Sequence, residues 1–295
     1  MNADMNKYLE KAEVLIEALP YIQRFNRRII VVKYGGSAMV DEELKKHVIQ
    51  DVTLLKLVGF KPIIVHGGGK EISRWVGKVG MEPNFINGLR VTDEETMEII
   101  EMVLVGKIST EIVSELIKHD GQAISLSGKD SSLIFAHKKE AKKIDEEIID
   151  LGLVGEVDCI NTDLLEMFLE NNYIPVISPV GIAKDGTSLN LNADTAAGEV
   201  ASAVGAEKLI ILTDVPGVLR DPSDPDSLIP KIRISEIPGL IEEGIISGGM
   251  IPKIETCVQA IEKGVKSCHI IDGRKKHSLL LEVFTTEGIG TMILK

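Results

Sequence analysis

The sequence predicts an α/β protein, a three-layer αβα sandwich around a mostly parallel central sheet, with an extra helix at the N-terminus. Short apolar runs at 29–32, 62–65 and 208–212, the last of them apolar after its first residue Lys208, alternate with helical patterns. Strands that are buried on both faces are typical of parallel sheets covered by helices. Glycine-rich turns follow the first two of these runs, so we expect a ligand site beyond the carboxyl ends of the strands.

Composition narrows the class of protein. A 295-residue chain that is 44% hydrophobic can bury a large core, which excludes disorder. The formal charge of −12 argues against a nucleic-acid partner, which needs a basic face on the protein. No apolar run approaches the ~20 residues of a membrane helix, and no signal-peptide core is present, so we expect a cytoplasmic protein with no membrane partner. The three cysteines lack metal-ligand spacing, which predicts inert packing rather than a disulfide framework or a zinc site: Cys159, Cys257 and Cys268.

The first segment, residues 7–22, has the apolar spacing of an amphipathic helix whose extent Pro20 limits. It lies before the first strand and is therefore an appendage. Two interpretations stay open, a helix packed on its own body and an arm that grips a neighbouring subunit.

The next elements follow from local signals. Asp41 and the acids after it open a helix that Gly59 closes. A second helix runs through Trp75. The Asn87-Gly88 pair predicts a hairpin turn, and Thr92 with Glu95 forms a capping box for a long helix that reaches about Lys118.

The second half continues the alternation. The polar stretch 129–160 predicts a β-hairpin excursion, and Lys184-Asp185-Gly186 predicts another hairpin turn. The remaining strands are expected at 123–126, 173–177, 266–271 and 291–294, and the remaining helices at 162–169, 193–204, 235–243 and 252–263.

Three glycine-rich segments carry the chemistry. Lys33 ends a buried strand beside Gly35 and Gly36, where backbone N–H groups can face an anion. Glycines 67–69 lie between a strand and a helix, the context of an anion site. Lys253 follows Gly248, Gly249 and Pro252 in the first turn of a helix, where a cation opposes the dipole unless a phosphate shares the site. Neither of the first two segments matches a P-loop or a G-x-G-x-x-G fingerprint.

Two further residues suit a site that holds negative charge. Asp194 either caps the helix that follows it or pairs with one or both lysines. Arg90, placed by the hairpin, either binds a carboxylate through its planar fork or is simply exposed. No Ser/His or Cys/His pair is indicated, so the site predicts charge neutralisation rather than a nucleophilic side chain.

These segments appear in an order that resembles the amino acid kinase family, and within it the branch that phosphorylates N-acetyl-L-glutamate. The resemblance spans about residue 27 to the C-terminus. The motifs are Lys33-Tyr34-Gly35-Gly36-Ser37, Val65-His66-Gly67-Gly68-Gly69, Asn87-Gly88-Leu89-Arg90-Val91-Thr92, 190–197, Thr213-Asp214-Val215-Pro216-Gly217-Val218 and 248–253.

The resemblance implies the fold, the reaction and the domains. It implies a lobe at 27–192 for N-acetyl-L-glutamate and a lobe at 193–295 for ATP, with residues 1–26 as an oligomerisation and regulatory helix. The implied reaction is ATP-dependent phosphorylation of the side-chain carboxylate to N-acetyl-L-glutamyl 5-phosphate, the second step of arginine biosynthesis. Mg²⁺ would come with ATP, and no metal ligand is expected from the protein.

The resemblance also assigns roles to residues. Lys33 and Lys253 would stabilise the transferring phosphoryl group, and Asp194 would orient them. Lys70 stands after the glycines at a position where many relatives have proline. The resemblance therefore does not predict the charge at this point of the site. Substrate would contact Gly68, Gly69, Arg90 and Asn190, and the phosphates or nucleotide would contact Gly35, Gly36, Thr213, Asp214, Gly217, Gly248 and Gly249.

Regulation is the last implication. The N-terminal helix and the C-terminal segment are similar to the arginine-inhibited subset of the family, which forms hexamers as trimers of dimers. The implied L-arginine site comprises His269, Glu282, Gly288, Lys208 and Tyr21. A PII-type signalling protein is left open as a partner.

Two rival functions stay open. One is a kinase for another acid, such as a carrier-linked 2-aminoadipate. The other is a catalytically silent amino-acid sensor, against which both lysines and Asp194 argue.

Overall fold

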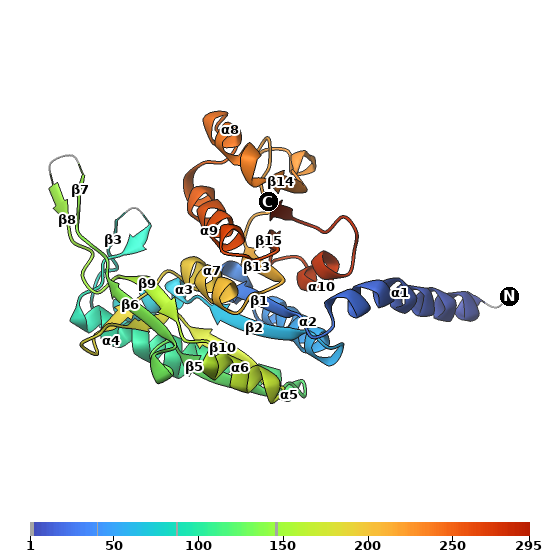
Figure 1. The fold of residues 1–295 in the computed structure, drawn as a ribbon, viewed down its shortest axis with the longest axis horizontal. Helices are drawn as coiled ribbons and strands as arrows, with labels where there is room; N and C mark the ends of the chain where they lie inside the picture. Colours follow the sequence, from blue (N-terminus) through green and yellow to red (C-terminus); the bar gives the residue numbers. More distant parts are fainter. Residues whose placement is uncertain (1–2, 40, 87, 145–146) are drawn as a thin grey trace.

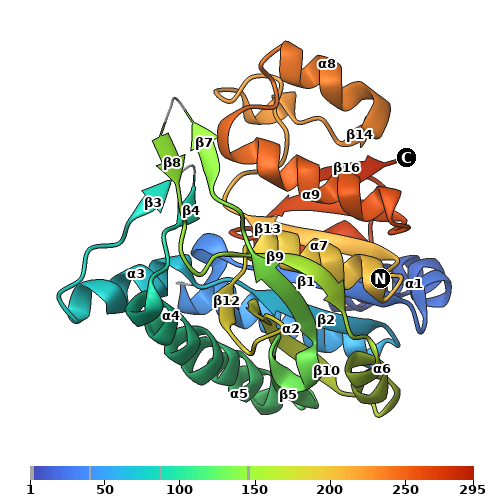
Figure 2. The same ribbon diagram turned by 60° about the vertical axis from the view of Figure 1, so that its left-hand side comes forward.

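The structure, a computed structural model, describes residues 3–39, 41–86, 88–144 and 147–295. An eight-stranded sheet lies between two layers of helices, and this confirms the predicted αβα class (Figures 1 and 2). Its strand order is β14-β16-β15-β13-β1-β2-β10-β5, and within it only β15 and β16 pair antiparallel. The strands of this sheet are β1 (Ile29–Tyr34), β2 (Lys61–His66), β5 (Ala123–Ser127), β10 (Ile174–Ser178), β13 (Lys208–Thr213), β14 (Lys231–Arg233), β15 (Ser267–Asp272) and β16 (Thr291–Leu294).

The helices follow the strands in alternation. They are α1 (Ala3–Phe25), α2 (Glu42–Leu57), α3 (Gly69–Lys78), α4 (Glu94–Glu101), α5 (Thr110–Lys118), α6 (Asp163–Glu170), α7 (Ala193–Ala203), α8 (Ile237–Glu242), α9 (Ile251–Glu262) and α10 (Ser278–Val283).

Two hydrophobic cores cover the two faces of the sheet. Along β1, Val31 packs into the core with α6, α7 and α9, whereas Ile30 and Val32 pack into the core with α2, α3, α5 and α10. Successive strand residues point to opposite faces, so an unbroken apolar run is what a sheet with two covered faces requires. The sheet therefore presents its polar groups only where the strands end.

Helix α1 runs through Pro20, so the prediction that this proline limits the helix was wrong. Proline removes one backbone hydrogen bond, but the carbonyl of Ile16 lies in an exposed turn where water can satisfy it. The helix projects from the body (Figure 1), and this excludes packing on its own body along the projecting turns. Its large apolar side chains that are exposed are Met5, Tyr8, Leu9, Val14, Leu15, Ile16 and Leu19.

The long helix predicted from Thr92 to Lys118 is interrupted. Asp93, rather than Thr92, caps α4 by accepting a hydrogen bond from the Thr96 N–H, because its carboxylate reaches the first turn. A π-helix, Met102–Ser109, separates α4 from α5. The Thr110 hydroxyl bonds the carbonyls of Gly106 and Lys107 at that junction. π-Helical turns are frequent at functional sites.

The predicted hairpins are present. β3 (Phe85–Ile86) pairs antiparallel with β4 (Leu89–Arg90), while Asn87 lies outside the described residues. β11 (Val180–Ile182) pairs antiparallel with β12 (Ser188–Asn190). The stretch 129–160 forms β6 (Ile134–Lys138), β7 (Lys142–Ile144), β8 (Glu147–Ile149) and β9 (Gly155–Ile160). Figures 1 and 2 place the β3–β4 and β7–β8 hairpins on the same side of the molecule.

Three smaller expectations differ from the structure. A second sheet has four strands in the order β12-β11-β6-β9. Cys159 is exposed rather than packed, because it lies on β9 at the edge of that sheet. The helix predicted at 235–243 shortens to α8 after a 3₁₀ turn at Ile234–Glu236. Strand β14 and helix α10 were not predicted, because three and six residues are too few to show a periodic pattern. Within the described residues, no helix has both the length and the apolarity that crossing a bilayer requires.

A buried ionisable pair joins α2 to the residue before α10. The Asp51 carboxylate is fully buried and lies 2.6 Å from His277 Nδ1. The ring of His47 packs edge-on against His277, with 4.6 Å between centroids. Burial raises the pKa of Asp51 from 3.8 to about 6, although the hydrogen bond and charge of His277 oppose this.

We therefore expect Asp51→Asn to change how stability depends on pH. The folded pKa of Asp51 exceeds its unfolded value, so wild-type stability falls as the pH rises from about 4 to about 6 and is then flat with respect to this group. The asparagine variant lacks this loss. Urea unfolding at pH 4 to 7 should show the variant gaining on the wild type by on the order of 2 kcal/mol across that window.

Asp93→Asn is the matched control. Hydrogen bonds from Thr96 lower the pKa of Asp93, so its titration lies below the window and its difference from wild type should stay constant there. A pH-independent difference for Asp51→Asn would contradict the burial argument.

Candidate active site

Three charged side chains from distant parts of the chain meet at one carboxylate. Lys33 Nζ, at the end of β1, lies 2.8 Å from Asp194 Oδ1. Lys253 Nζ, in the first turn of α9, lies 2.6 Å from Asp194 Oδ2. Asp194 sits in the first turn of α7, and Asn192 caps that helix, so the capping interpretation of Asp194 is wrong. We call Lys33, Asp194 and Lys253 the ion triad.

The ion triad is mostly desolvated and carries a net positive charge. The side chains of Lys33 and Asp194 are 11% and 14% exposed. Burial alone would raise the pKa of Asp194, but the charges of Lys33 and Lys253 lower it, so the carboxylate stays ionised. Two cations on one anion leave one formal positive charge that an anionic ligand can neutralise.

Two glycine turns approach the ion triad closely. A Cβ built on Gly35 would lie 2.7 Å from Lys33 Nζ, so only glycine lets the ammonium group fold over the turn. A Cβ on Gly67 would lie 3.8 Å from Ala193 Cβ and 3.9 Å from Gly35 Cα. The ends of β1 and β2 and the start of α7 therefore converge, and the turn at Gly67–Gly69 lies beside the lysines.

Arg90 is buried rather than exposed, at 7% exposure. Its NH2 group donates to the Gly69 carbonyl at 2.9 Å and to Ser73 Oγ at 2.8 Å. The guanidinium also stacks on the Phe85 ring. Its NH1 group is buried and has no hydrogen-bond partner among the described residues. Burying a cationic donor without a partner costs free energy, so the NH1 group is available to donate a hydrogen bond to an anionic ligand.

Asn190 joins the same corner through Thr92. Asn190 Nδ2 donates to Thr92 Oγ1 at 3.1 Å, and Thr92 Oγ1 donates to the Arg90 carbonyl at 2.9 Å. The end of β12 is thereby tied to the end of β4. Arg90 and Asn190, 100 residues apart, share one polar corner of the site.

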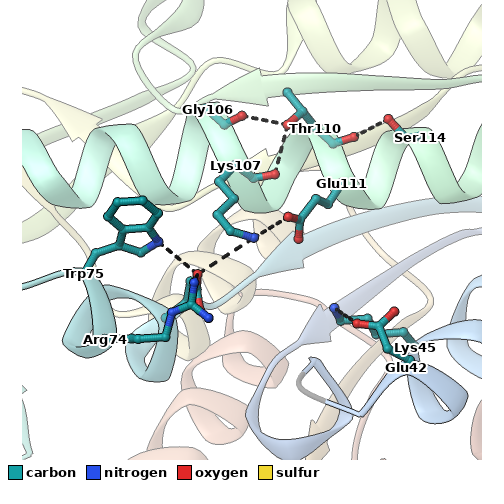
Figure 3. Close-up of polar contacts among 10 residues, drawn as sticks. Glu42, Lys45, Arg74, Trp75, Gly106, Lys107, Thr110, Glu111 and Ser114 are labelled. Atoms are coloured by element: carbon teal, nitrogen blue, oxygen red, sulfur yellow. Dashed lines mark hydrogen bonds and ion pairs between the residues drawn. The ribbon is translucent and has the colours of Figure 1, made fainter. Parts of the chain in front are cut away.

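A cavity of about 750 Å³ opens beside the turn, between α2, α3 and the α5 end of the π-helix. Gly36, Gly68, Gly69 and Lys70 line it, and Lys70 is exposed there. Part of the polar network in Figure 3 lines its wall, namely Glu42, Lys45, Glu71, Arg74, Lys107 and Glu111. Glu71 accepts a hydrogen bond from Trp75 Nε1 at 2.9 Å and forms an ion pair with Arg74. Lys107 forms ion pairs with Glu71 and Glu111. A separate ion pair joins Lys45 to Glu42.

The residues predicted for the nucleotide lie on β13 and before α9. Thr213 ends β13, the neighbour of β1, and its hydroxyl donates to Asp214 Oδ1 at 3.4 Å. Gly217 follows in the next turn, where the Val218 N–H donates to Thr291 Oγ1. Gly248 and Gly249 form a 3₁₀ turn that leads into α9 and Lys253. No described hydrogen bond or ion pair joins Thr213, Asp214 or Gly217 to the ion triad.

A second cavity, of about 440 Å³, brings together all the residues predicted for the effector. His269 Nδ1 lies 2.5 Å from Glu282 Oε1, and Lys208 Nζ lies 3.0 Å from His269 Nε2. Gly288 lies against the Glu282 carboxylate, which the Ile289 N–H also donates to. Tyr21 lines the cavity from α1. The Glu282 side chain is buried in the wall of this cavity.

Burial and pairing set the charges in this second cavity. Burial lowers the pKa of His269, although its hydrogen bond to Glu282 opposes this, so the ring is neutral at pH 7. Burial would raise the pKa of Glu282, but His269, Ile289 and Lys208 together lower it. The cavity thus holds a carboxylate in reach of a ligand cation.

Residues 28–272 match the amino acid kinase family. The chain belongs to the amino acid kinase family. An acetylglutamate kinase of Methanobrevibacter smithii is 73% identical over 97% of this chain and 100% of that protein. An acetylglutamate kinase of Methanothermobacter thermautotrophicus is 58% identical over 97% of this chain and 99% of that protein. The chain therefore lies among the acetylglutamate kinases of this family.

A solved relative has the same fold. It is the N-acetylglutamate synthase of Neisseria gonorrhoeae in complex with coenzyme A and N-acetyl-glutamate, with a TM-score of 0.84 and 27% identity over 96% of this chain. This chain spans 63% of that synthase's length. The fold class of the amino acid kinase family is thus shown by sequence and by structure.

The sequence pointed to neither of two polar pairs at this kinase site. Asp272 ends β15 beside Thr213 and holds Arg274 through two hydrogen bonds of 2.9 Å. His66 ends β2 and bonds Ser178, at the end of β10. Asp272 and Arg274 are two residues apart, so the end of the strand predicted at 266–271 could have pointed to them. The partnership of His66 with Ser178 depends on strand order, which a single sequence does not state.

The turn before α3 makes a stability prediction. A Cβ on Gly68 would lie 2.5 Å from Leu104 Cδ2 and 2.6 Å from Ile108 Cδ1, whereas a Cβ on Gly69 meets nothing within 4 Å. Gly68→Ala should therefore lower the free energy of unfolding by about 1–3 kcal/mol through overpacking. Gly69→Ala, the matched control, should change it by less than about 0.5 kcal/mol. Urea denaturation measures both, and equal losses would contradict the packing at Gly68.

Proposed function

We propose that this chain transfers the γ-phosphoryl group of ATP to the side-chain carboxylate of N-acetyl-L-glutamate, a step of arginine biosynthesis. The observation that carries the proposal is the ion triad, two lysines held on Asp194 beside two glycine turns. Such an arrangement neutralises anions without supplying a nucleophile. The relatives named as acetylglutamate kinases support the choice of substrate.

Arg90 and Asn190 are the proposed contacts of the acetylated amino-acid end. The unpartnered NH1 group of Arg90 suits the α-carboxylate of the substrate. Asn190, tied to Arg90 through Thr92, offers an amide next to it. Gly68 and Gly69 would bind the other end of the substrate through backbone N–H groups.

Catalysis then consists of positioning and charge neutralisation. A glutamate side chain, with a reference pKa near ~4.3, is already ionised at neutral pH, so no general base is needed. One carboxylate oxygen forms a bond to the γ-phosphorus while the bond from that phosphorus to the bridging oxygen of ADP breaks. Lys33 and Lys253 neutralise the charge on the transferring group, and Asp194 fixes both ammonium groups.

The nucleotide is assigned to residues 193–295 and the acceptor to residues 27–192. Gly35, Gly36, Gly248 and Gly249 would face the phosphates, and Thr213, Asp214 and Gly217 would line the nucleotide side. Asp194 is engaged by both lysines, so the protein groups at this site are cations rather than metal ligands. Mg²⁺ would therefore be held through the phosphates of ATP, where it supplies further positive charge.

A coupled assay of ADP release tests the proposal. N-acetyl-L-glutamate, L-glutamate, L-aspartate and 2-aminoadipate are offered separately with Mg-ATP. We expect turnover with N-acetyl-L-glutamate above all the others, because the site in the proposal reads both an α-carboxylate and an acetylated amine. Absence of turnover with N-acetyl-L-glutamate would falsify the proposal, and preference for 2-aminoadipate would favour the rival kinase.

Lys33→Ala and Lys253→Ala show whether the measured turnover belongs to the ion triad. Each should lower kcat by about 10²–10³-fold, because each removes one charge from the transition state. Lys263→Ala is the matched control, since Lys263 follows the last residue of α9 and its ion pair with Glu199 of α7 lies away from the ion triad. Circular dichroism confirms that each variant is folded. Full activity of either lysine variant would refute its role.

We also propose feedback inhibition by L-arginine at the second cavity. Its guanidinium would pair with the buried Glu282 carboxylate, near His269, Lys208, Gly288 and Tyr21. An N-acetylglutamate synthase structure of the same fold, 26% identical with a TM-score of 0.80, is a complex with coenzyme A and L-arginine. The exposed apolar side chains of α1 support interlacing of dimers into a hexamer. A PII-type partner and a cytoplasmic location stay predictions.

Deletion of residues 1–26 and Glu282→Gln should separate assembly from effector binding. The deletion should yield dimers in light scattering and weaken arginine inhibition, because it removes Tyr21 and the projecting helix together. Glu282→Gln should stay hexameric yet need at least about tenfold more arginine for half-inhibition, since a charge-assisted hydrogen bond is lost. A hexameric deletion variant, or unchanged inhibition of Glu282→Gln, would count against the respective role.

A further inference from the structure

A buried histidine lies directly before the glycine turn and has no part in the mechanism above. His66 ends β2 and is fully buried. Its Nδ1 lies 2.9 Å from the Gly67 carbonyl oxygen, and its Nε2 lies 3.0 Å from Ser178 Oγ. Burial lowers the pKa of His66 to about 4, against the hydrogen bond to Gly67, so the ring is neutral at pH 7.

The partners of His66 determine its tautomer. A carbonyl oxygen only accepts hydrogen bonds, so Nδ1 must carry the proton and donate it to Gly67. Nε2 is then an acceptor, and the Ser178 hydroxyl must donate to it. Ser178 Oγ also lies 3.3 Å from the Leu104 carbonyl of the π-helix, but its single proton is used by the shorter contact. Ser178, placed beside His66 by the pairing of β10 with β2, therefore fixes the ring.

The contact with Gly67 sets the direction of the next N–H group. The peptide bond between Gly67 and Gly68 is trans and planar, so its C=O and N–H point in opposite directions. A carbonyl held toward the buried ring aims the Gly68 N–H away from the ring and out of the sheet edge. Among the described residues, none accepts a hydrogen bond from that N–H.

The other side of the turn is fixed as well. Leu104 and Ile108 of the π-helix fill the space where a Gly68 side chain would lie. Lys107, between them in that π-helix, reaches Glu71 of α3 (Figure 3). The turn is therefore clamped between His66 below and the π-helix at its side. A donor that is fixed before the reaction stabilises developing charge without reorganisation.

We propose that His66 is a positioning residue: as the neutral Nδ1–H tautomer it holds the Gly67 carbonyl and so aims the Gly68 N–H at an oxygen anion of the reacting groups. The inference rests on the proposed phosphoryl transfer for the identity of that oxygen, which belongs to the acceptor carboxylate or to the transferring phosphoryl group. His66 itself touches neither substrate.

His66→Asn and His66→Gln form the matched pair that tests this. Asparagine can place an amide N–H where Nδ1 lies, whereas glutamine places its amide near Nε2 and leaves the Gly67 carbonyl unheld. We expect His66→Asn to keep kcat within about threefold of the wild type. His66→Gln should lower kcat by at least about tenfold, part of the about 10²–10³-fold loss seen when an oxyanion donor is removed.

The Michaelis constant for ATP should change less than twofold in both variants, because the loss lies in the transition state. A purely structural role would lower kcat equally in the two variants, or would raise the Michaelis constant for ATP in both. His137→Gln, which changes an exposed side chain near the end of β6, controls for the loss of a histidine as such. Equal loss of kcat in His66→Asn and His66→Gln overturns the proposal.

The ring tautomer gives a readout that does not need activity. Solid-state ¹⁵N NMR of histidine-labelled protein at pH 7 should show His66 protonated at Nδ1, its signal assigned by its loss in His66→Asn. Protonation at Nε2 overturns the proposal, even where His66→Gln fails to fold. A wild-type protein that does not turn over N-acetyl-L-glutamate overturns the proposed function instead, and the tautomer still decides the role of His66.

Discussion

The site depends on one carboxylate that holds two lysines. Lys33 and Lys253 are 220 residues apart in the chain, and Asp194 brings them together from the first turn of a third element. Two ammonium groups placed this close would repel each other in a site with little water, and the shared carboxylate removes that cost. The sheet and the helical layer that contains α7 and α9 are arranged so that β1, α7 and α9 deliver these three groups to one point. In a chain with a formal charge of −12, the proposed function assigns to this local excess of cations the binding of two anionic substrates.

Backbone geometry complements the side-chain charges. Gly35 lets Lys33 fold over its turn, and the turn after β2 lies in contact with Ala193 at the start of α7. N–H groups exposed in such turns bind anions without adding a formal charge. The π-helix and His66 hold the second turn from two sides, so its donors are rigid rather than adaptable. Fixed donors and a fixed pair of lysines are what a reaction without protein nucleophile requires.

The sequence predicted the parts of the fold that local chemistry determines. Unbroken apolar strands, the Asp41 cap of α2 and the hairpin before Arg90 are properties of a few neighbouring residues, and they were correct. The errors arise where exposure to solvent or tertiary contacts override local signals. Helix α1 passes through Pro20 because its carbonyls face solvent, and a π-helix replaces a regular turn where it packs on Gly68. Arg90 and Glu282 could not be recognised as buried, because burial depends on segments far away in the chain.

The two cavities are connected by packed structure. Helix α10 carries Glu282 in the second cavity, and the residue before it, His277, holds Asp51 on α2. Helix α2 begins three residues after the turn at Gly36–Met39, next to the ion triad. His277 adopts a left-handed backbone conformation, φ 53°, to make this contact, so the junction tolerates little variation. A ligand that displaced Glu282 would therefore act on α10, and the start of α10 is held to α2 by His277 and Asp51. Helix α2 follows the turn that contains Gly36, so α10 and α2 together span the distance between the two cavities.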